Sequence, residues 1–221
     1  MKAIVFDFDG VVLDTETADY QSWHSLYARH GAVLPLEDWM RLIGTDPATA
    51  GFDPGVRLAE LTGIPETELR AERAPVYDAL ARGLEPMSGI LDWIRDADRL
   101  GVQLAIASSS PLWWVDGHLG RVGLRSAFET LATAEDVERV KPDPALYQLA
   151  LDRLGISAVD AFAIEDSLHG VAAARAAGLA CVAVPGPMTE TQDFDAASCR
   201  MSTLADRSLA DMIEELARLH A

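Results

Sequence analysis

The stretch Ala3-Ile4-Val5-Phe6-Asp7-Phe8-Asp9-Gly10, close to the start of the chain, decides the fold. Its first four residues are apolar, a pattern typical of a parallel β-strand that is buried on both faces. Two aspartates separated by one bulky residue follow, and Gly10 then permits a tight turn with a free amide. Carboxylates this close repel each other, so the pair indicates a bound cation or a shared proton. A solvated acidic turn is the alternative for this stretch taken alone.

The same apolar pattern recurs along the chain and alternates with helical patterns. We predict further strands at residues 103–107, 130–132, 161–164 and 180–184, and helices at 88–100, 112–122, 144–154 and 169–177. Strands that alternate with helices form right-handed crossovers and a parallel sheet. The predicted fold class is therefore α/β, with a doubly wound parallel sheet of the Rossmann-like kind.

Residues 15–83 break this alternation. They contain helical patterns and no convincing strand. We therefore expect a small all-helical cap domain inserted after the first strand. Within it, residues 44–55 are rich in Gly, Pro and Asp, which predicts a loop. The catalytic core would then consist of residues 1–14 and 84–221.

Polar residues stand where three of the predicted strands end. In an open parallel sheet, ligands bind beyond the carboxyl ends of the strands, so Asp7, Ser108 and Asp166 are expected to meet at one edge. Glu165, next to Asp166, adds oxygen ligands for a hard cation such as Mg²⁺. Ordinary helix capping is the alternative explanation for Asp166 and Ser167, and also for Ser108-Ser109-Ser110, where Pro111 would take the first helical position.

Lysine is rare in this chain and occurs only at Lys2 and Lys141. The second stands in the turn Lys141-Pro142-Asp143-Pro144, where the prolines restrict the backbone before a predicted helix. Any chemical step that needs a lysine ammonium therefore has two candidates. An exposed lysine without a chemical role is the alternative for Lys141.

Composition excludes several classes of protein. The net charge of −17 argues against binding to nucleic acid or to anionic membranes. No apolar stretch approaches the roughly 18 residues that span a bilayer, and no signal peptide is evident at the N-terminus. Cys181 and Cys199 do not make a disulfide framework. We expect a cytoplasmic protein, and a monomer is reasonable for a capped enzyme of 221 residues.

Four segments together resemble the motifs of the haloacid dehalogenase-like hydrolase superfamily. The stretch Phe6-Asp7-Phe8-Asp9-Gly10-Val11-Val12-Leu13-Asp14-Thr15-Glu16 resembles its first motif, and Ser108, Lys141 and Glu165-Asp166 follow in the order of the other three. The resemblance covers the whole chain and is greatest for the β-phosphoglucomutase and phosphoglycolate phosphatase-like branch. It implies a Rossmann-like core, a helical cap and phosphoryl transfer.

The resemblance also implies a role for each residue. Asp7 would be the nucleophile that forms an aspartyl-phosphate, and Asp9 the general acid and base. Mg²⁺ would be held by Asp7, Asp9, Glu165 and Asp166, with Asp9 contributing its backbone carbonyl. The phosphoryl oxygens would be bound by Gly10, Ser108, Ser109 and Lys141. Lys141 would also hold Asp7 in position and so count among the catalytic residues.

The branch of the family follows from single residues. Asp9 favours attack on phosphorus, since dehalogenases lack this second acid, and the absence of lysine from residues 15–83 closes the Schiff-base route of phosphonatases. A sugar-phosphate mutase of the β-phosphoglucomutase kind stays as the alternative, although Asp19 stands where its cap histidine is expected and residues 46–48 lack its arginine. A phosphorylated receiver module is a further alternative, but receivers have no helical insert.

We therefore expect a Mg²⁺-dependent phosphatase that hydrolyses a small phosphorylated metabolite, such as a sugar phosphate. Its specificity is expected to depend on residues near Glu16, Trp23 and the 44–55 loop. Trp113 and Trp114 are expected to pack against the core or the cap.

Overall fold

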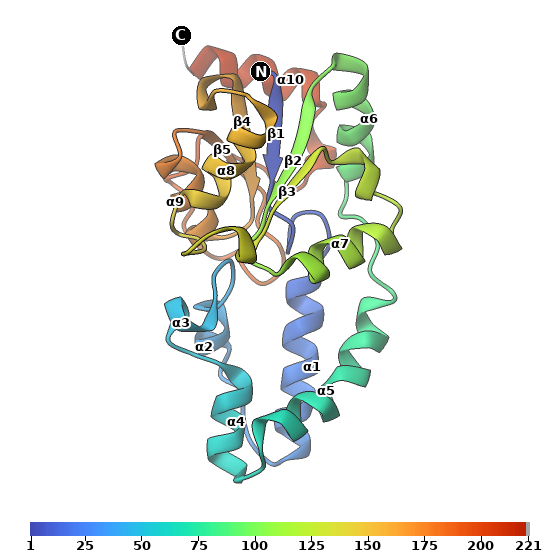
Figure 1. Ribbon diagram of the computed structural model, residues 1–221, viewed down its shortest axis with the longest axis vertical. Helices are drawn as coiled ribbons and strands as arrows, with labels where there is room; N and C mark the ends of the chain where they lie inside the picture. The colour runs from blue at the N-terminus through green and yellow to red at the C-terminus, as the bar shows by residue number, and fades with distance from the viewer. Residues whose placement is uncertain (220–221) are drawn as a thin grey trace.

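The computed structural model describes residues 1–219, and its strands gather in one half of the molecule above a helical lobe (Figure 1). The strands in this part of the chain are β1 (Ala3–Phe6), β2 (Gln103–Ala107), β3 (Thr130–Ala132), β4 (Ala161–Glu165), β5 (Ala180–Ala183) and β6 (Cys199–Arg200). All pair in parallel, in the order β3-β2-β1-β4-β5-β6. The central strand β1 therefore ends in the middle of the carboxyl edge of the sheet.

Helices cover both faces of the sheet. Ile4 and Phe6 of β1 belong to one apolar layer, which also contains α6 (Ile90–Leu100), α7 (Leu112–Arg121) and α10 (Leu209–Leu219). Ala3 and Val5 point to the other layer, against α8 (Ala145–Leu154) and α9 (Leu168–Ala176). This arrangement is the doubly wound α/β fold predicted from the alternation of strands and helices. Short 3₁₀ turns connect the elements at η1 (Arg125–Ala127), η2 (Ala134–Asp136), η3 (Ala158–Asp160) and η4 (Leu204–Asp206).

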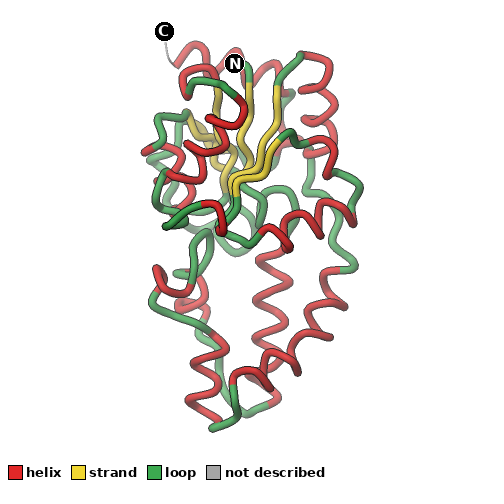
Figure 2. The backbone as a smooth tube through the Cα atoms, viewed as in Figure 1, coloured by secondary structure: helices red, strands yellow, loops and turns green. Residues whose placement is uncertain are grey.

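The lobe below the sheet is built from helices and loops (Figure 2). Its helices are α1 (Thr15–Arg29), α2 (Leu36–Met40), α3 (Pro47–Ala50), α4 (Pro54–Thr62) and α5 (Glu66–Ala81). An apolar cluster of its own, which includes Trp23, Tyr27 and Trp39, fills the lobe. The two connections to the sheet run side by side, since Leu13 pairs with Pro86 in an isolated antiparallel bridge. We propose on this basis that residues 15–83 form a cap and that residues 1–14 and 84–221 form the core.

The structure confirms the predicted strands and core helices to within two residues at each end, and it adds the two-residue β6. The loop predicted at residues 44–55 is wrong in part, because α3 lies inside it and α4 begins at Pro54. Both helices start with an Asp-Pro pair. Asp46 and Asp53 accept backbone N–H groups of the first turn, and the proline that follows occupies a position where no amide is needed. Among residues 1–219, no helix has the length and apolar character needed to span a bilayer.

Candidate active site

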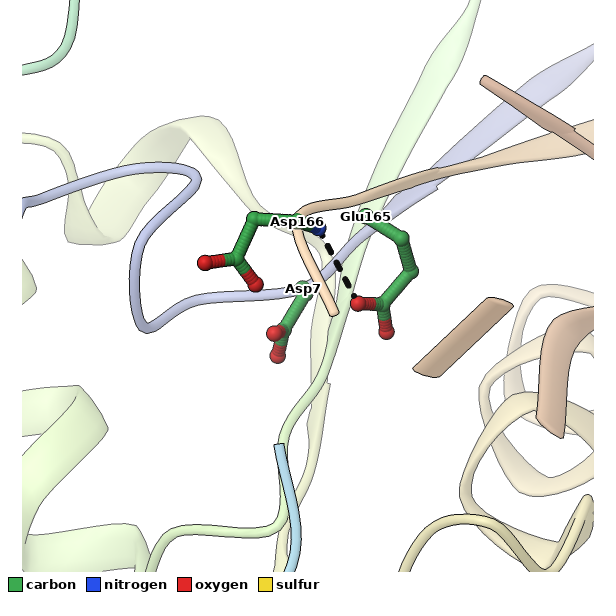
Figure 3. A group of neighbouring side chains, drawn as sticks. All are labelled: Asp7, Glu165 and Asp166. Atoms are coloured by element: carbon green, nitrogen blue, oxygen red, sulfur yellow. Dashed lines mark hydrogen bonds between the residues drawn. The ribbon is translucent and has the colours of Figure 1, made fainter. Parts of the chain in front are cut away.

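Three carboxylates meet where β1 and β4 end. Asp7 follows β1, Glu165 is the last residue of β4, and Asp166 follows it (Figure 3). A carboxylate oxygen from each lies within 4.8 Å of the others, and all three side chains are buried. The parallel pairing of β1 with β4 brings these residues together although they are far apart in the sequence. The acids predicted to meet at one edge of the sheet therefore do so.

Lys141 is the cation that faces this group. Its Nζ lies 2.7 Å from Oδ1 of Asp7 and 2.6 Å from Oε1 of Glu165, and its side chain is fully buried. The hydroxyl of Tyr147 also donates to Oε1 of Glu165. Burial disfavours a charged ammonium, but the adjacent carboxylates outweigh that effect and raise the pKa of Lys141. The exposed-lysine alternative is therefore excluded for Lys141.

The cluster still carries more negative charge than Lys141 can neutralise. Burial, followed by the charge of Glu165, raises the pKa of Asp7 to about 8. Burial, followed by the charge of Asp7, raises the pKa of Asp166 well above its usual value. Carboxyl groups resist ionisation in this way when no sufficient positive charge is near. A divalent cation would supply the missing charge.

The donor set fits Mg²⁺. Oδ1 of Asp166 is buried and has no hydrogen-bond partner in the described part of the chain, which is costly unless the oxygen binds something else. A Cβ added at Gly10 would lie 2.0 Å from Oδ2 of Asp166, so the turn after β1 must approach this carboxylate closely. Gly10 also has a φ of 77°, which glycine adopts without strain. Carboxylate oxygens are the ligands that Mg²⁺ prefers.

The carboxylate of Asp9 does not belong to this group of three acids and has other partners. Its Oδ1 accepts hydrogen bonds from Thr15 Oγ1 at 2.6 Å and from Trp114 Nε1 at 2.8 Å. Its Oδ2 accepts from Ser110 Oγ at 2.6 Å and from Ser108 Oγ at 3.3 Å. The carboxylate of Asp9 is therefore separate from the group formed by the other three acids, and a contribution to a metal through its backbone carbonyl stays a prediction.

The partner of Asp9, Trp114, connects the core to the lobe. It lies on α7, and its ring stacks on Tyr77 of α5 with centroids 5.0 Å apart. His118, one turn along α7, contacts the ring of Trp114 edge to face, and its Nε2 lies 3.1 Å from the hydroxyl of Tyr77. Helix α5 of the lobe therefore contacts Trp114, the residue whose indole N–H donates a hydrogen bond to Asp9.

The lobe also contacts the core on the side of Lys141. Thr45 Oγ1 donates to the backbone carbonyl of Lys141 at 2.6 Å, and Ser109 Oγ donates to the carbonyl of Gly44 at 3.1 Å. A Cβ added at Gly44 would lie 2.2 Å from Oγ of Ser167. The segment 44–45 is therefore docked tightly beside the acidic group.

A cleft of about 380 Å³ lies between these two contacts. Asp9, Ser109 and Ser110 line it from the core, and Trp113 and Trp114 line it from α7. Glu16, Trp23 and the start of α3 line it from the lobe, and their role in specificity stays a prediction. Its size suits a small phosphorylated molecule.

The capping alternatives hold in the structure for Ser167 but not for Asp166 or Ser108. Ser167 is the residue that caps α9, since its Oγ accepts the amide of Gly170, so Asp166 is free of that role. The first amide of α7, that of Leu112, donates to the carboxylate of Glu135 rather than to Ser108. Ser108 instead accepts the amide of Ser110 and donates to Asp9.

The sequence did not identify three partners of Asp9. Thr15 stands within the first motif quoted above and Ser110 follows Ser108 by two residues, so their positions offered a signal, whereas nothing in the sequence marks Trp114 as a partner of Asp9. The expectation that both tryptophans pack was wrong for Trp113, whose surface is 70% exposed at the mouth of the cleft. Trp114 does pack, but it also hydrogen-bonds to Asp9.

The fold and the site define a class of protein, namely a doubly wound α/β enzyme whose buried carboxylates lie at the edge of the sheet that faces a helical lobe. The haloacid dehalogenase-like hydrolase family matches this sequence over residues 4–184. The chain belongs to that family, as the four motifs indicated.

Relatives and solved structures agree. The chain is 40% identical over 218 residues to YhcW of Bacillus subtilis (strain 168), whose name proposes a phosphatase, with 98% of both chains covered. It is 31% identical to validoxylamine A 7'-phosphate phosphatase of Streptomyces hygroscopicus subsp. limoneus, over 88% of this chain and 89% of the relative. These relatives support a phosphoric monoester hydrolase.

Two crystal structures show the same fold. That of a CbbY mutant from Rhodobacter sphaeroides in complex with xylulose-(1,5)bisphosphate matches with a TM-score of 0.78 and 28% identity, over 95% of this chain and 98% of that one. That of β-phosphoglucomutase from Clostridium difficile matches with a TM-score of 0.79 over 99% and 98% of the two chains. At 19% identity, the second comparison shows the fold alone.

Proposed function

We propose that this protein is a Mg²⁺-dependent phosphatase that hydrolyses a small phosphomonoester through an aspartyl-phosphate on Asp7. The observation that carries the proposal is the position of Asp7, whose Oδ1 is 2.7 Å from the buried Nζ of Lys141 and whose carboxylate belongs to the three-acid group. The cleft between core and lobe lies next to this group, with Asp9 and Ser109 on its wall.

In the first step, a carboxylate oxygen of Asp7 bonds to phosphorus as the bond to the leaving oxygen breaks. Asp9 supplies the proton that the leaving oxygen takes up. To do so it must exchange its present partners, Thr15, Trp114 and Ser110, for the substrate. Water then attacks phosphorus, gives a proton to Asp9, and the bond to Asp7 breaks with release of inorganic phosphate.

The other residues hold charge in place. Lys141 orients Asp7 and binds a phosphoryl oxygen, with help from the hydroxyl of Ser108 and the amides near Gly10 and Ser109. Asp7, Asp166, Glu165 and the backbone carbonyl of Asp9 are the proposed ligands of Mg²⁺. When bound, Mg²⁺ offsets the repulsion between carboxylate and phosphate and keeps Asp7 ionised. The hydroxyl of Ser109 would have to leave the carbonyl of Gly44 to join the phosphate site.

The mutase alternative has less support. A mutase must hold a second phosphate in the cap while it reorients its intermediate. Asp19, which stands where the mutase histidine is expected, is ion-paired with Arg73. Arg70, the other arginine on the wall of the cleft, is paired with Asp53. The cleft therefore presents these arginines already neutralised, which favours water over a sugar as the acceptor.

Phosphate release tests the proposal. The wild-type enzyme should release phosphate from para-nitrophenyl phosphate and from sugar phosphates with Mg²⁺ and should lose that activity in excess EDTA. Asp7→Asn should abolish release while the thermal midpoint stays close to that of the wild type or rises, because one buried charge is removed. Full activity of Asp7→Asn would contradict the mechanism. The cytoplasmic location and the monomeric state stay predictions.

A further inference from the structure

The charge of the cleft beyond the phosphoryl site is unusual for an enzyme that binds anions. The lobe contributes two arginines, Arg70 and Arg73, to its wall, together with the carboxyl groups of Glu16, Asp19, Asp46 and Asp53. We call this part of the wall the distal cleft. Under the proposed function, the portion of the substrate that leaves when phosphorus is attacked would lie against this wall, so the charge of the wall bears on the choice of leaving group.

Arg70 is held by two carboxylates. Its Nη2 donates to both oxygens of Asp53 at 2.7 Å, and its Nε donates to Oε1 of Glu66 at 2.6 Å. The three groups together carry one negative charge. A second phosphate or a carboxylate on the substrate would therefore meet an arginine whose positive charge is already more than offset by two carboxylates.

Arg73 is neutralised as well. It forms an ion pair with Asp19 and donates its Nε to Oγ of Ser22. Its guanidinium also lies over the ring of Trp23, 4.6 Å from the centroid, and its side chain is only 15% exposed. Breaking a largely buried ion pair leaves an uncompensated charge and is strongly unfavourable. Arg73 is therefore a fixed part of the wall.

Asp46 adds an uncompensated charge. It is half-buried at the start of α3, where its carboxylate accepts the amide of Thr49. No lysine or arginine of residues 1–219 lies within ion-pair distance of it. The distal cleft therefore has a negative balance even when both arginines are counted.

The remaining surface of the cleft includes aromatic side chains. Of the tryptophans on its wall, Trp113 is 70% exposed and offers a broad apolar face, whereas Trp23 and Trp39 are almost fully buried. Such a face suits the C–H surface of a cyclic polyol, while the carboxylates around it accept hydrogen bonds from hydroxyl or ammonium groups. Neither feature suits an anion.

We propose that the substrate is a monophosphate of a sugar or cyclitol whose leaving group is neutral or carries an amine, and that the distal cleft rejects leaving groups with a second phosphate or a carboxylate. This inference rests on the proposed phosphatase function and refines it. The proposed preference for a monophosphate differs from the bisphosphate found in the CbbY structure, although the two proteins have the same fold.

Four probes with one carbon skeleton test the proposal: glucosamine 6-phosphate, glucose 6-phosphate, 6-phosphogluconate and glucose 1,6-bisphosphate. The leaving group is cationic in the first, neutral in the second and anionic in the last two. We expect kcat/KM to be at least about ten-fold higher for the first two than for the last two at low salt. The difference should narrow as salt is added, because screening weakens repulsion.

A matched pair of variants locates the effect. Glu66→Gln keeps a hydrogen-bonding group beside Arg70 but removes the surplus charge, so it should lower the preference for glucose 6-phosphate over 6-phosphogluconate at least about two-fold. Glu68→Gln makes the same change of charge at an exposed position on the same helix and should leave that preference unchanged.

The failures can be told apart. Equal or faster hydrolysis of 6-phosphogluconate or the bisphosphate would overturn the inference alone, as would hydrolysis of para-nitrophenyl phosphate without that of either glucosamine 6-phosphate or glucose 6-phosphate. An equal effect of Glu66→Gln and Glu68→Gln would overturn the assignment to the distal cleft. No release of phosphate from para-nitrophenyl phosphate would overturn the proposed function itself.

Discussion

The indole N–H of Trp114 donates a hydrogen bond to Oδ1 of Asp9 at 2.8 Å, while the same ring stacks on Tyr77 of the lobe. The proposed general acid is therefore held by a residue that the lobe contacts directly. Movement of α5 relative to α7 would change the packing of Trp114 and, with it, the position of Asp9. The two parts of the molecule are linked at the residue that must handle the proton.

Trp114→Phe should lower kcat about ten-fold and change KM little. Phenylalanine keeps an aromatic ring against Tyr77 but cannot donate to Asp9, and ten-fold corresponds to about 1.4 kcal/mol, within the range of about 0.5–1.5 kcal/mol for a typical intramolecular hydrogen bond. Steady-state kinetics and thermal unfolding measure the two effects separately. Tyr77→Phe removes a hydroxyl that contacts His118 rather than Asp9 and should change kcat much less. Equal kinetics for Trp114→Phe and the wild type would show that the contact has no role in positioning.

The two lysines of the chain allow the stability contribution of a buried ion pair to be compared with that of an exposed one. Lys141→Ala should destabilise the protein by about 3–5 kcal/mol, because it leaves Asp7 and Glu165 buried without their cation. Lys2→Ala should cost far less, since the side chains of Lys2 and its partner Asp160 are exposed to solvent. Urea unfolding of both variants provides the measurement. Similar losses for the two would contradict the buried position of Lys141.

Two glycines of the lobe allow the effect of backbone strain to be distinguished from the effect of a steric clash. Gly44 and Gly51 have φ values of 81° and 66°, so alanine is strained at either, by roughly 1 kcal/mol. A Cβ at Gly44 would collide with Ser167, whereas one at Gly51 would meet nothing within 4 Å. Gly44→Ala should therefore lower kcat/KM by displacing the segment docked beside Lys141, and Gly51→Ala should affect stability alone. Equal activity of the two variants would exclude a role for the docked segment.

The carboxyl group of Glu16 makes stability depend on pH. Burial, followed by the charge of Asp9, raises the pKa of Glu16 from 4.5 to about 8. Between these values the native state holds a proton that the unfolded chain has lost, so the stabilising contribution present below pH 4.5 is lost as the pH rises towards 8. Glu16→Gln should therefore raise the thermal midpoint more at about pH 8.5 than at about pH 5, measured in EDTA. The same shift at both pH values would contradict the raised pKa.

Much of this structure could be predicted from the sequence, for identifiable reasons. The apolar run at residues 3–6 and its later counterparts mark the strands, and the parallel sheet then brings their polar ends together, which places Asp7 near Asp166. The Asp-Pro starts of α3 and α4 were recognisable as helix caps but were interpreted as part of a loop.

Contacts between the lobe and the core could not be predicted in the same way. They depend on how two bodies meet rather than on any local pattern. Thr45 donates to the carbonyl of Lys141, 96 residues away in the sequence, and Tyr77 stacks on Trp114, through side chains that ordinary surfaces also contain. The ion pairs of Arg70 and Arg73 likewise become visible only once α1, α4 and α5 are assembled.

The covalent intermediate is the central claim, and mass spectrometry of the acid-quenched enzyme tests it most directly. Enzyme mixed with Mg²⁺ and substrate, then quenched within one turnover, should gain the mass of one phosphoryl group on the peptide that contains Asp7. The added mass should disappear in Asp7→Asn and persist longer in Asp9→Asn, which lacks the base that activates water. Rapid turnover with no phosphorylated peptide, or a phosphoryl group on another residue, would contradict the account.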